Sequence, residues 1–192
     1  MLILQHPLEV HHAKNTARLL HLSLTGSRLV VGEVFDDVQL QALVPPNNYS
    51  ILVYPPQPLD GNNDGNTPHC VAAQLDATRL PPMAPASKTT LIVLDATWRK
   101  SRKMLHTSPA LQRLPRLSLD KVPPSGYTVR KAHKEGQLST LEATCAALAQ
   151  LEGDTAKFTH LLHAFSRFVA QQIARRPDSP GKLFHDATPH IP

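Results

Sequence analysis

The stretch "LIVLDATWRKSRKML", residues 91–105, decides the fold class and marks one candidate site. Four apolar residues run directly into Asp95, and Trp98, the only tryptophan in the chain, follows three positions later. An apolar run of this kind is typical of a strand that is covered on both faces of a parallel sheet, and helical spacing begins after it. The stretch therefore predicts a buried strand that ends at an acid and continues into a basic helix.

Strand and helix patterns alternate through the rest of the chain. The expected strands are residues 1–5, 29–34, 51–54, 89–95 and 116–119. The expected helices are one capped by Asn15, one over residues 97–106, one that begins with a capping box at Ser139 and Glu142, and a last one with an apolar stripe over residues 158–173. Strands that alternate with helices predict an α/β fold with a mostly parallel sheet and flanking helices.

The length of 192 residues allows one well-buried core and favours a single domain. Residues 55–87 are rich in proline, glycine and asparagine, which predicts a long loop with one short helical piece. The residues after the last expected helix have the composition of an extended tail. We therefore expect one catalytic domain over residues 1–176 and a C-terminal tail over residues 177–192.

Composition argues against a membrane protein and against a metal centre. No apolar run approaches the ~20 residues that a membrane span requires, and the first residues lack the basic region of a signal peptide, so we expect a cytoplasmic protein. Cys70 and Cys145 are far apart and lack CxxC spacing. His160 and His163 share a helical face, but a metal site needs three or four ligands and no third one is near in sequence. We expect no bound metal.

Positive charge is concentrated in one segment. Residues 99–134 contain ten Lys and Arg against one acid, a net charge of +9, whereas the rest of the chain carries −4. Such a segment is typical of a surface that contacts nucleic-acid phosphates, although a solvated basic surface explains it equally well.

Asp95 is a site candidate because ligands of open α/β sheets bind beyond the carboxyl ends of the strands. The alternative is that Asp95 or Thr97 only caps the following helix. In that helix Trp98, Ser101, Arg102 and Leu105 recur at helical spacing, so we expect them to share one face. Neither a GxGxxG nor a GxxxxGK[ST] motif is present, which excludes the two common phosphate-binding loops.

Three separated motifs, "LDATWRKSRKML", "LPRLSL" and "YTVRKAHKEGQLSTLEA", together with "LILQHPLEVHHAKNTARL" near the start, resemble the DTW-domain family. The family's Asp-x-Thr-Trp motif stands here as Asp95, Thr97 and Trp98. The resemblance implies a tRNA-uridine aminocarboxypropyltransferase, which moves the 3-amino-3-carboxypropyl group of S-adenosylmethionine to a ring nitrogen of a tRNA uridine and leaves methylthioadenosine. It also implies a SPOUT-like fold with a C-terminal trefoil-knotted cofactor-binding region.

The resemblance and the residue types together assign the expected site. Asp95 is the catalytic candidate, as a base or as a group that positions the uridine. The expected cofactor-binding residues are Thr97, Trp98, Leu117, Leu119, Tyr127, Arg130, Leu138, Ser139 and Thr140. The expected RNA-binding residues are Arg99, Lys100, Arg102, Lys103, Lys131 and Lys134. Ser139 opens a helix, whose unpaired N–H groups favour an anion such as the methionine carboxylate, and Arg130 suits either that carboxylate or a phosphate.

We expect a monomer that binds tRNA. Two other functions stay open at this point: a SPOUT-type RNA methyltransferase that uses the same cofactor, and an RNA-binding module without catalytic activity.

Overall fold

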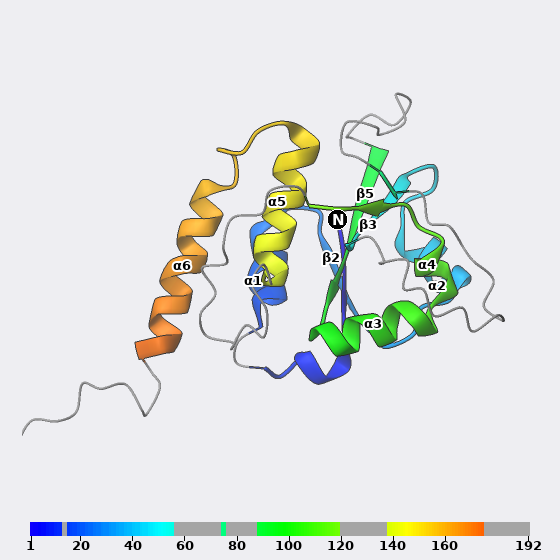
Figure 1. Cartoon of the computed structure of the whole chain (residues 1–192), viewed down its shortest axis with the longest axis horizontal. Helices are drawn as coiled ribbons and strands as arrows, with labels where there is room; N and C mark the ends of the chain where they lie inside the picture. The colour runs from blue at the N-terminus through cyan, green and yellow to red at the C-terminus, as the bar shows by residue number, and fades with distance from the viewer. Residues whose placement is uncertain (13–14, 56–73, 76–87, 120–137, 175–192) are drawn as a thin grey trace, which may run out of the picture.

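The computed structural model describes residues 1–12, 15–55, 74–75, 88–119 and 138–174. Within these residues, six strands form one sheet in the order β2-β1-β5-β3-β6-β4 (Figure 1). The strands are β1 (Leu2–Gln5), β2 (Arg28–Val31), β3 (Tyr49–Val53), β4 (Gln74–Leu75), β5 (Thr89–Asp95) and β6 (Arg116–Leu117). All five strand pairs of this sheet are parallel, which confirms the predicted α/β class.

Strand β5 lies inside the sheet, between β1 and β3. Its apolar run is buried because helices cover both faces of the sheet at this strand, as the uninterrupted run predicts. The prediction for residues 89–95 is confirmed at both ends. Strand β2 is at one edge of the sheet and is partly exposed, because it has a neighbouring strand on one side alone.

Two layers of helices cover the sheet (Figure 1). On one face lie α1 (Thr16–Ser23), α5 (Thr140–Glu152) and α6 (Thr159–Ala174), and on the other lie α2 (Asp37–Leu43), α3 (Trp98–Thr107) and α4 (Pro109–Gln112). Alternate residues of each strand enter opposite cores, so that Ile3 and Val93 pack on the α5 side whereas Leu4 and Ile92 pack on the α3 side. The side chain of the last residue in each strand therefore contacts the helices of one layer and not those of the other.

The two predicted helix starts with side-chain caps are confirmed. Asn15 Oδ1 accepts a hydrogen bond from the backbone N–H of Arg18 at 3.0 Å. At α5, Ser139 Oγ accepts from the N–H of Glu142 at 3.2 Å, and the Glu142 carboxylate accepts from the N–H of Ser139 at 2.8 Å. These reciprocal bonds form a capping box and fix where the helix begins.

The sequence did not predict helix α2, although its start carries a signal. Asp36 accepts a hydrogen bond from the N–H of Gln39 at 2.8 Å, and the Gln39 side chain accepts from the N–H of Asp36 at 3.2 Å. Leu40 is buried, but Val38 is exposed, so this seven-residue helix has no apolar stripe to reveal it. Within the long segment predicted as a loop with a helical piece, residues 74–75 form strand β4.

The predicted face of α3 is buried along one part of its length and exposed along the rest. Ser101 and Leu105 are buried, as expected, together with Met104. Trp98 and Arg102, assigned to the same face, are exposed. In the last helix, the predicted apolar stripe is confirmed by the buried side chains of Phe165 and Val169. The tail over residues 177–192 and the segment 120–137 lie outside the described residues.

Candidate functional site at the carboxyl edge of the sheet

The connections of β1 and β5 leave the sheet in opposite directions. After β1 the chain passes through α1 to β2 on one side, and after β5 it passes through α3 and α4 toward β6 on the other side. Ligands of open α/β sheets bind beyond the carboxyl ends of strands at such a switch point. The last residues of the two strands, Gln5 and Asp95, are register partners here.

Asp95 is a buried carboxylate that joins three elements. It is 7% exposed, and its two oxygens accept hydrogen bonds from Gln5 Nε2 at 2.8 Å and from Thr140 Oγ1 at 2.6 Å. Its backbone carbonyl accepts from the N–H of His6 at 3.0 Å. An ionised carboxylate has about four acceptor positions, so each oxygen keeps acceptor capacity beyond these two hydrogen bonds.

The helix-capping alternative for this acid is wrong. The N-cap of α3 is Thr97, which makes no side-chain hydrogen bond to the helix. The Asp95 carboxylate is directed instead to α5 and β1, because residue 95 shares its face of the sheet with Val93 on the α5 side. A capping role for either residue therefore does not account for the Asp-x-Thr-Trp motif.

Sequence reasoning missed Gln5, which is 2% exposed. The available signal is that an amide ends an otherwise apolar strand, "LILQ", at the same level as the aspartate that ends β5. Its pairing with Asp95 follows from the parallel register of β1 and β5, which the sequence alone does not supply.

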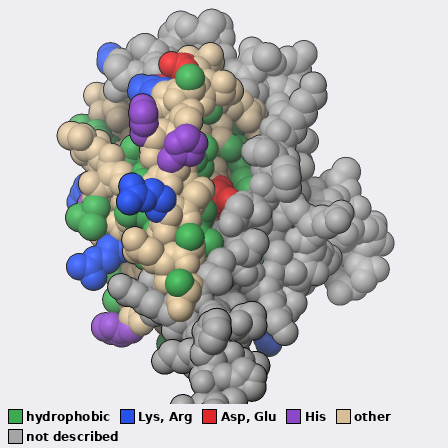
Figure 2. Space-filling model, turned by 90° about the vertical axis from the view of Figure 1, so that its left-hand side faces the viewer, with side chains coloured by type: hydrophobic (Ala, Val, Ile, Leu, Met, Phe, Trp, Pro, Cys, Tyr) green, Lys and Arg blue, Asp and Glu red, His purple; other side chains and the backbone are tan. Residues whose placement is uncertain are grey.

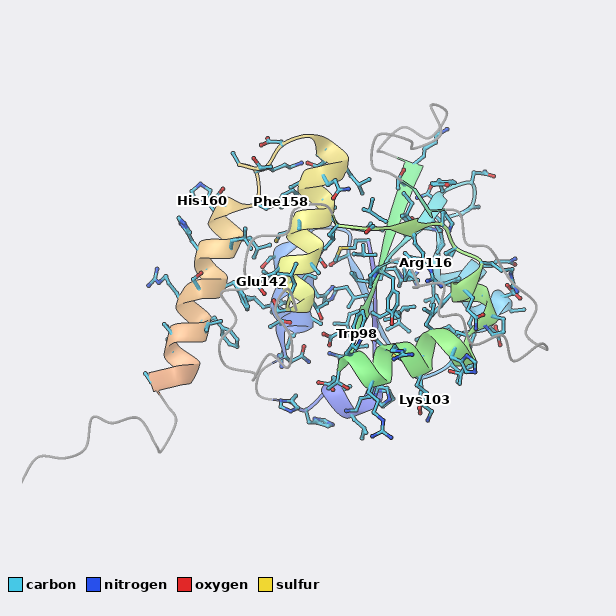
Figure 3. The ribbon with its side chains drawn as sticks, viewed as in Figure 1. Trp98, Lys103, Arg116, Glu142, Phe158 and His160 are labelled. Atoms are coloured by element: carbon cyan, nitrogen blue, oxygen red, sulfur yellow. The ribbon has the colours of Figure 1, made fainter. Side chains whose placement is uncertain are left out.

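On the opposite face of the sheet, Trp98, Tyr54 and Arg116 form a second cluster at the same edge. Figure 3 labels two of its members, Trp98 and Arg116. The rings of Tyr54 and Trp98 stack with centroids 5.4 Å apart and an interplanar angle of 6°. Arg116 Cζ lies 5.7 Å from the centroid of the Tyr54 ring. Trp98 remains 51% exposed, so one side of this cluster is open to a ligand.

Burial shifts the pKa values of two members of this cluster. Burial raises the pKa of Tyr54, and the nearby Ser101, Arg102 and Arg116 partly offset the rise. Ser101 lies close to the Tyr54 hydroxyl without the geometry of a hydrogen bond, and it donates its own proton to the Trp98 carbonyl at 3.0 Å. Burial also lowers the pKa of Arg116.

The structure brings several of the expected cofactor-binding residues to this edge. The Leu117 carbonyl accepts from the N–H of Tyr54 at 3.3 Å, which connects β6 to the Trp98 cluster. Leu119 packs against the core on the α5 side, and Leu138 is half-buried just before the α5 capping box. The predicted residues Tyr127, Arg130, Lys131 and Lys134 lie outside the described residues.

The four cations of α3 differ in their surroundings. Lys100 Nζ donates to the buried Glu9 at 3.0 Å, and Lys103 Nζ donates to Glu33 at 2.6 Å. Lys103, and to a smaller degree His6, lowers the pKa of Glu33. The other two, Arg99 and Arg102, are exposed, and no ion pair or hydrogen bond joins them to any other described residue.

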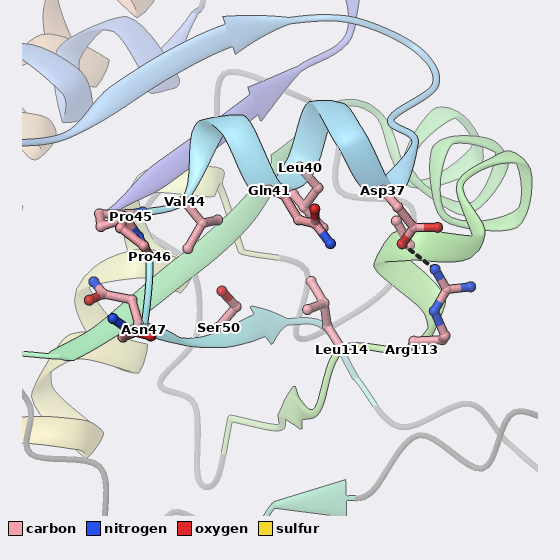
Figure 4. A pocket seen from close by; sticks show the side chains of 12 residues that line it. Asp37, Leu40, Gln41, Val44, Pro45, Pro46, Asn47, Ser50, Arg113 and Leu114 are labelled. Atoms are coloured by element: carbon pink, nitrogen blue, oxygen red, sulfur yellow. Dashed lines mark hydrogen bonds and ion pairs between the residues drawn. The ribbon is translucent and has the colours of Figure 1, made fainter.

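A separate groove of about 510 Å³ lies between α2 and α4 (Figure 4). Asn48 and Ser50, at the start of β3, line one wall, so the groove lies at the amino edge of the sheet, away from Asp95. An ion pair between Asp37 and Arg113 closes one end. We do not take this groove as the candidate site, because neither the Asp95 cluster nor the Trp98 cluster contributes a side chain to its lining.

Two further findings limit the chemistry of the described residues. They contain no group of three His, Cys, Asp or Glu side chains that could hold a metal ion, and His160 and His163 are exposed on α6. Figure 2 shows this side of the molecule, where histidine and basic side chains are spread between other surface groups. No helix in the described part of the chain combines the length and apolar character that a membrane span needs.

The fold and the two edge clusters define an α/β protein with a candidate ligand site at the carboxyl edge of a parallel sheet. The family model for the DTW domain matches residues 1–173, and the chain belongs to this family. It is 31% identical over 161 residues to tRNA-uridine aminocarboxypropyltransferase 2 of Drosophila melanogaster. The alignment covers 79% of this chain and 56% of that relative. No solved structure matches the chain.

Proposed function

We propose that this protein is an enzyme that transfers the 3-amino-3-carboxypropyl group of S-adenosylmethionine to a ring nitrogen of a uridine in tRNA. The observation that carries the proposal is the hydrogen bond between Asp95 and Thr140. It joins the Asp-x-Thr-Trp motif at the end of β5 to the "LST" motif at the start of α5, 45 residues later, at the switch point of the sheet. The name of the Drosophila relative supports the same reaction.

The reaction replaces a carbon–sulfur bond by a carbon–nitrogen bond. The uridine ring nitrogen attacks the γ-carbon of the methionine moiety, the electron pair of the carbon–sulfur bond goes to sulfur, and methylthioadenosine leaves. The proton of the uridine N–H must be removed in the same process. Asp95 is the group that accepts this N–H and either aligns it or takes its proton, since each of its oxygens keeps a free acceptor position.

The half-exposed indole of Trp98 fits a cofactor that carries an adenine ring and a sulfonium group, because a flat aromatic face attracts both. When bound, S-adenosylmethionine supplies a carbon activated by the positive sulfur. The protein's task is then positioning, since three carbons are attached to that sulfur and the one nearest the uridine determines the product. Thr97, Leu117, Leu119, Leu138, Ser139 and Thr140 are the proposed lining of this pocket, together with Tyr127 and Arg130.

The finer architecture belongs to the same proposal. It includes a SPOUT-like arrangement with a C-terminal trefoil-knotted cofactor-binding region, which rests on the family resemblance. A single domain over residues 1–176, followed by a tail, is consistent with the family match to residues 1–173.

The tRNA surface is proposed to include the exposed edge of α3. Arg99 and Arg102 are available to phosphates, whereas Lys100 and Lys103 are engaged by Glu9 and Glu33. Lys131 and Lys134 complete the predicted set of phosphate-binding residues.

The experiment that tests the function is incubation of the protein with labelled S-adenosylmethionine and unmodified tRNA, followed by mass analysis of nucleosides and by-product together. We expect aminocarboxypropyl-uridine and methylthioadenosine in equal amounts. Adenosylhomocysteine together with a methylated nucleoside would establish the methyltransferase instead. Binding of tRNA without any binding of S-adenosylmethionine would establish an RNA-binding module.

A further inference from the structure

Two buried polar atoms in the described part of the chain have no hydrogen-bond partner, and they belong to side chains that contact each other. They are Tyr54 Oη and Arg116 Nε. Folded proteins pair almost all such atoms, so two unpaired ones in one cluster point to a ligand that accepts hydrogen bonds. Tyr54 stacks on the half-exposed Trp98, at the edge where the cofactor is proposed to bind, and Arg116 lies over the Tyr54 ring.

The charge of Arg116 supports the same conclusion. The side chain carries a permanent positive charge, the residue is 6% exposed, and no acid among the described residues forms an ion pair with it. A buried charge without a counter-ion is costly to a fold. By contrast, the buried Glu9 has Lys100 as its counter-ion. Arg116 therefore needs an anion from outside the described fold.

The position of Arg116 favours a small molecule over the RNA backbone as the source of that anion. Its Nε is buried and unpaired, and the guanidinium presents Nε and the neighbouring terminal nitrogen as two donors side by side. Their fork matches a single carboxylate, which can also accept the Tyr54 hydroxyl proton. The phosphates of an RNA backbone bind to cations on the solvent-exposed surface. Arg99 and Arg102 are exposed cations of this kind, whereas Arg116 is buried.

We propose that Arg116, together with the Tyr54 hydroxyl, binds the α-carboxylate of the methionine moiety of S-adenosylmethionine. The proposal rests on the function proposed above and assigns Arg116 a role that its sequence motif does not reveal. The other candidate place for this carboxylate, the start of α5, already holds an acid. Glu142 Oε2 accepts hydrogen bonds there from both the N–H and the hydroxyl of Ser139, each at 2.8 Å.

The test compares Arg116→Met with Arg113→Met, a matched control at an exposed arginine that pairs with Asp37. Dissociation constants are measured by calorimetry for S-adenosylmethionine, for its decarboxylated analogue, which lacks the carboxylate alone, and for methylthioadenosine. We expect the wild type to prefer S-adenosylmethionine over the decarboxylated analogue by about 10- to 100-fold, the value of a charge-assisted contact. Arg116→Met should abolish this preference and leave methylthioadenosine binding unchanged, whereas Arg113→Met should change neither.

Two further variants keep the test decisive. Arg116→Lys retains the charge but loses the fork, so it should fold and reduce the preference, and it replaces Arg116→Met if that variant does not fold. Tyr54→Phe should reduce the preference by about 3- to 10-fold, since one hydrogen bond is lost.

Other outcomes would overturn the proposal. Equal losses for all three ligands would make Arg116 a packing residue, and weaker tRNA binding with normal S-adenosylmethionine binding would make it a phosphate contact. If the wild type modifies tRNA but Arg116→Met and Arg116→Lys both keep the full preference for the carboxylate, the role of Arg116 is refuted and the proposed function stands. A wild type that binds none of the three ligands would remove the proposed function as well.

Discussion

Replacement of Asp95 separates its structural role from its chemical role. Asp95→Ala leaves the donors of Gln5 and Thr140 without an acceptor, at about 1–3 kcal/mol each, so about 2–6 kcal/mol in total. The lower part of this range is expected, because Thr140 is half-buried and its hydroxyl can turn toward water. Asp95→Asn should cost about 1–2 kcal/mol, because Thr140 can still donate to the new amide oxygen and the Gln5 amide can turn to accept from the new NH₂ group. A domain of ordinary stability tolerates that loss.

The rate of transfer should respond in a different way. If Asp95 aligns or deprotonates uridine, Asp95→Asn should bind S-adenosylmethionine and tRNA nearly normally, yet lose roughly 10²–10⁴-fold in single-turnover rate. Urea unfolding and the rate are measured on the same preparation. Thr140→Ser is the control, because it keeps the hydroxyl that donates to Asp95 and should keep the rate, whereas Thr140→Val should not. A folded Asp95→Asn variant with near-normal turnover would refute the assignment and leave Asp95 as a structural link between β1, β5 and α5.

Two further predictions concern α3 and α5. Arg99→Ala combined with Arg102→Ala should weaken tRNA binding and flatten the plot of log K against log salt by about 1.4–1.8, whereas Lys103→Ala should leave the slope nearly unchanged because Glu33 already pairs with Lys103. Equal effects in the two variants would contradict this assignment. Burial, and secondarily Glu142, raises the pKa of Cys145 from 9.0 to about 11, so its contribution to stability is complete below pH 9 and is lost as the pH rises to 11. The free energy of unfolding should fall by roughly 2 kcal/mol more in the wild type than in Cys145→Ala over this range, and parallel curves would contradict burial of the thiol.

Local signals in the sequence predicted the elements that carry the Asp95 cluster. The apolar run before Asp95 predicted β5 at both ends, and the capping box of Ser139 and Glu142 predicted where α5 begins. Both signals depend on neighbours within a few residues, which is why they can be read without a fold. The resemblance to the DTW family then placed Asp95 and Thr140 in one site, and the structure joins them by a hydrogen bond.

The partners of these residues depend on strand order and could not be predicted. Gln5 meets Asp95 because β1 and β5 are neighbours in parallel register, although about 90 residues separate them in the chain. Tyr54 and Arg116 meet because β6 pairs with β3. In the sequence each of these three residues is simply a polar group at one end of a short apolar run. The capping interpretation of Asp95 failed for the same reason, since it considered the next helix and not the opposite layer.

The parallel register between β1 and β5 makes the site sensitive to a deletion within β5 but tolerant of a deletion in a surface connection. Successive side chains of a strand point to opposite faces, so the loss of one residue between Thr89 and Leu94 would turn Asp95 away from Gln5 and Thr140 toward the α3 layer. The same deletion in a surface connection would change no such alternation. Natural variation in this protein's length should therefore be absent from β5 and common between the strands, and a deletion scan read out by transfer activity would trace the strand residue by residue.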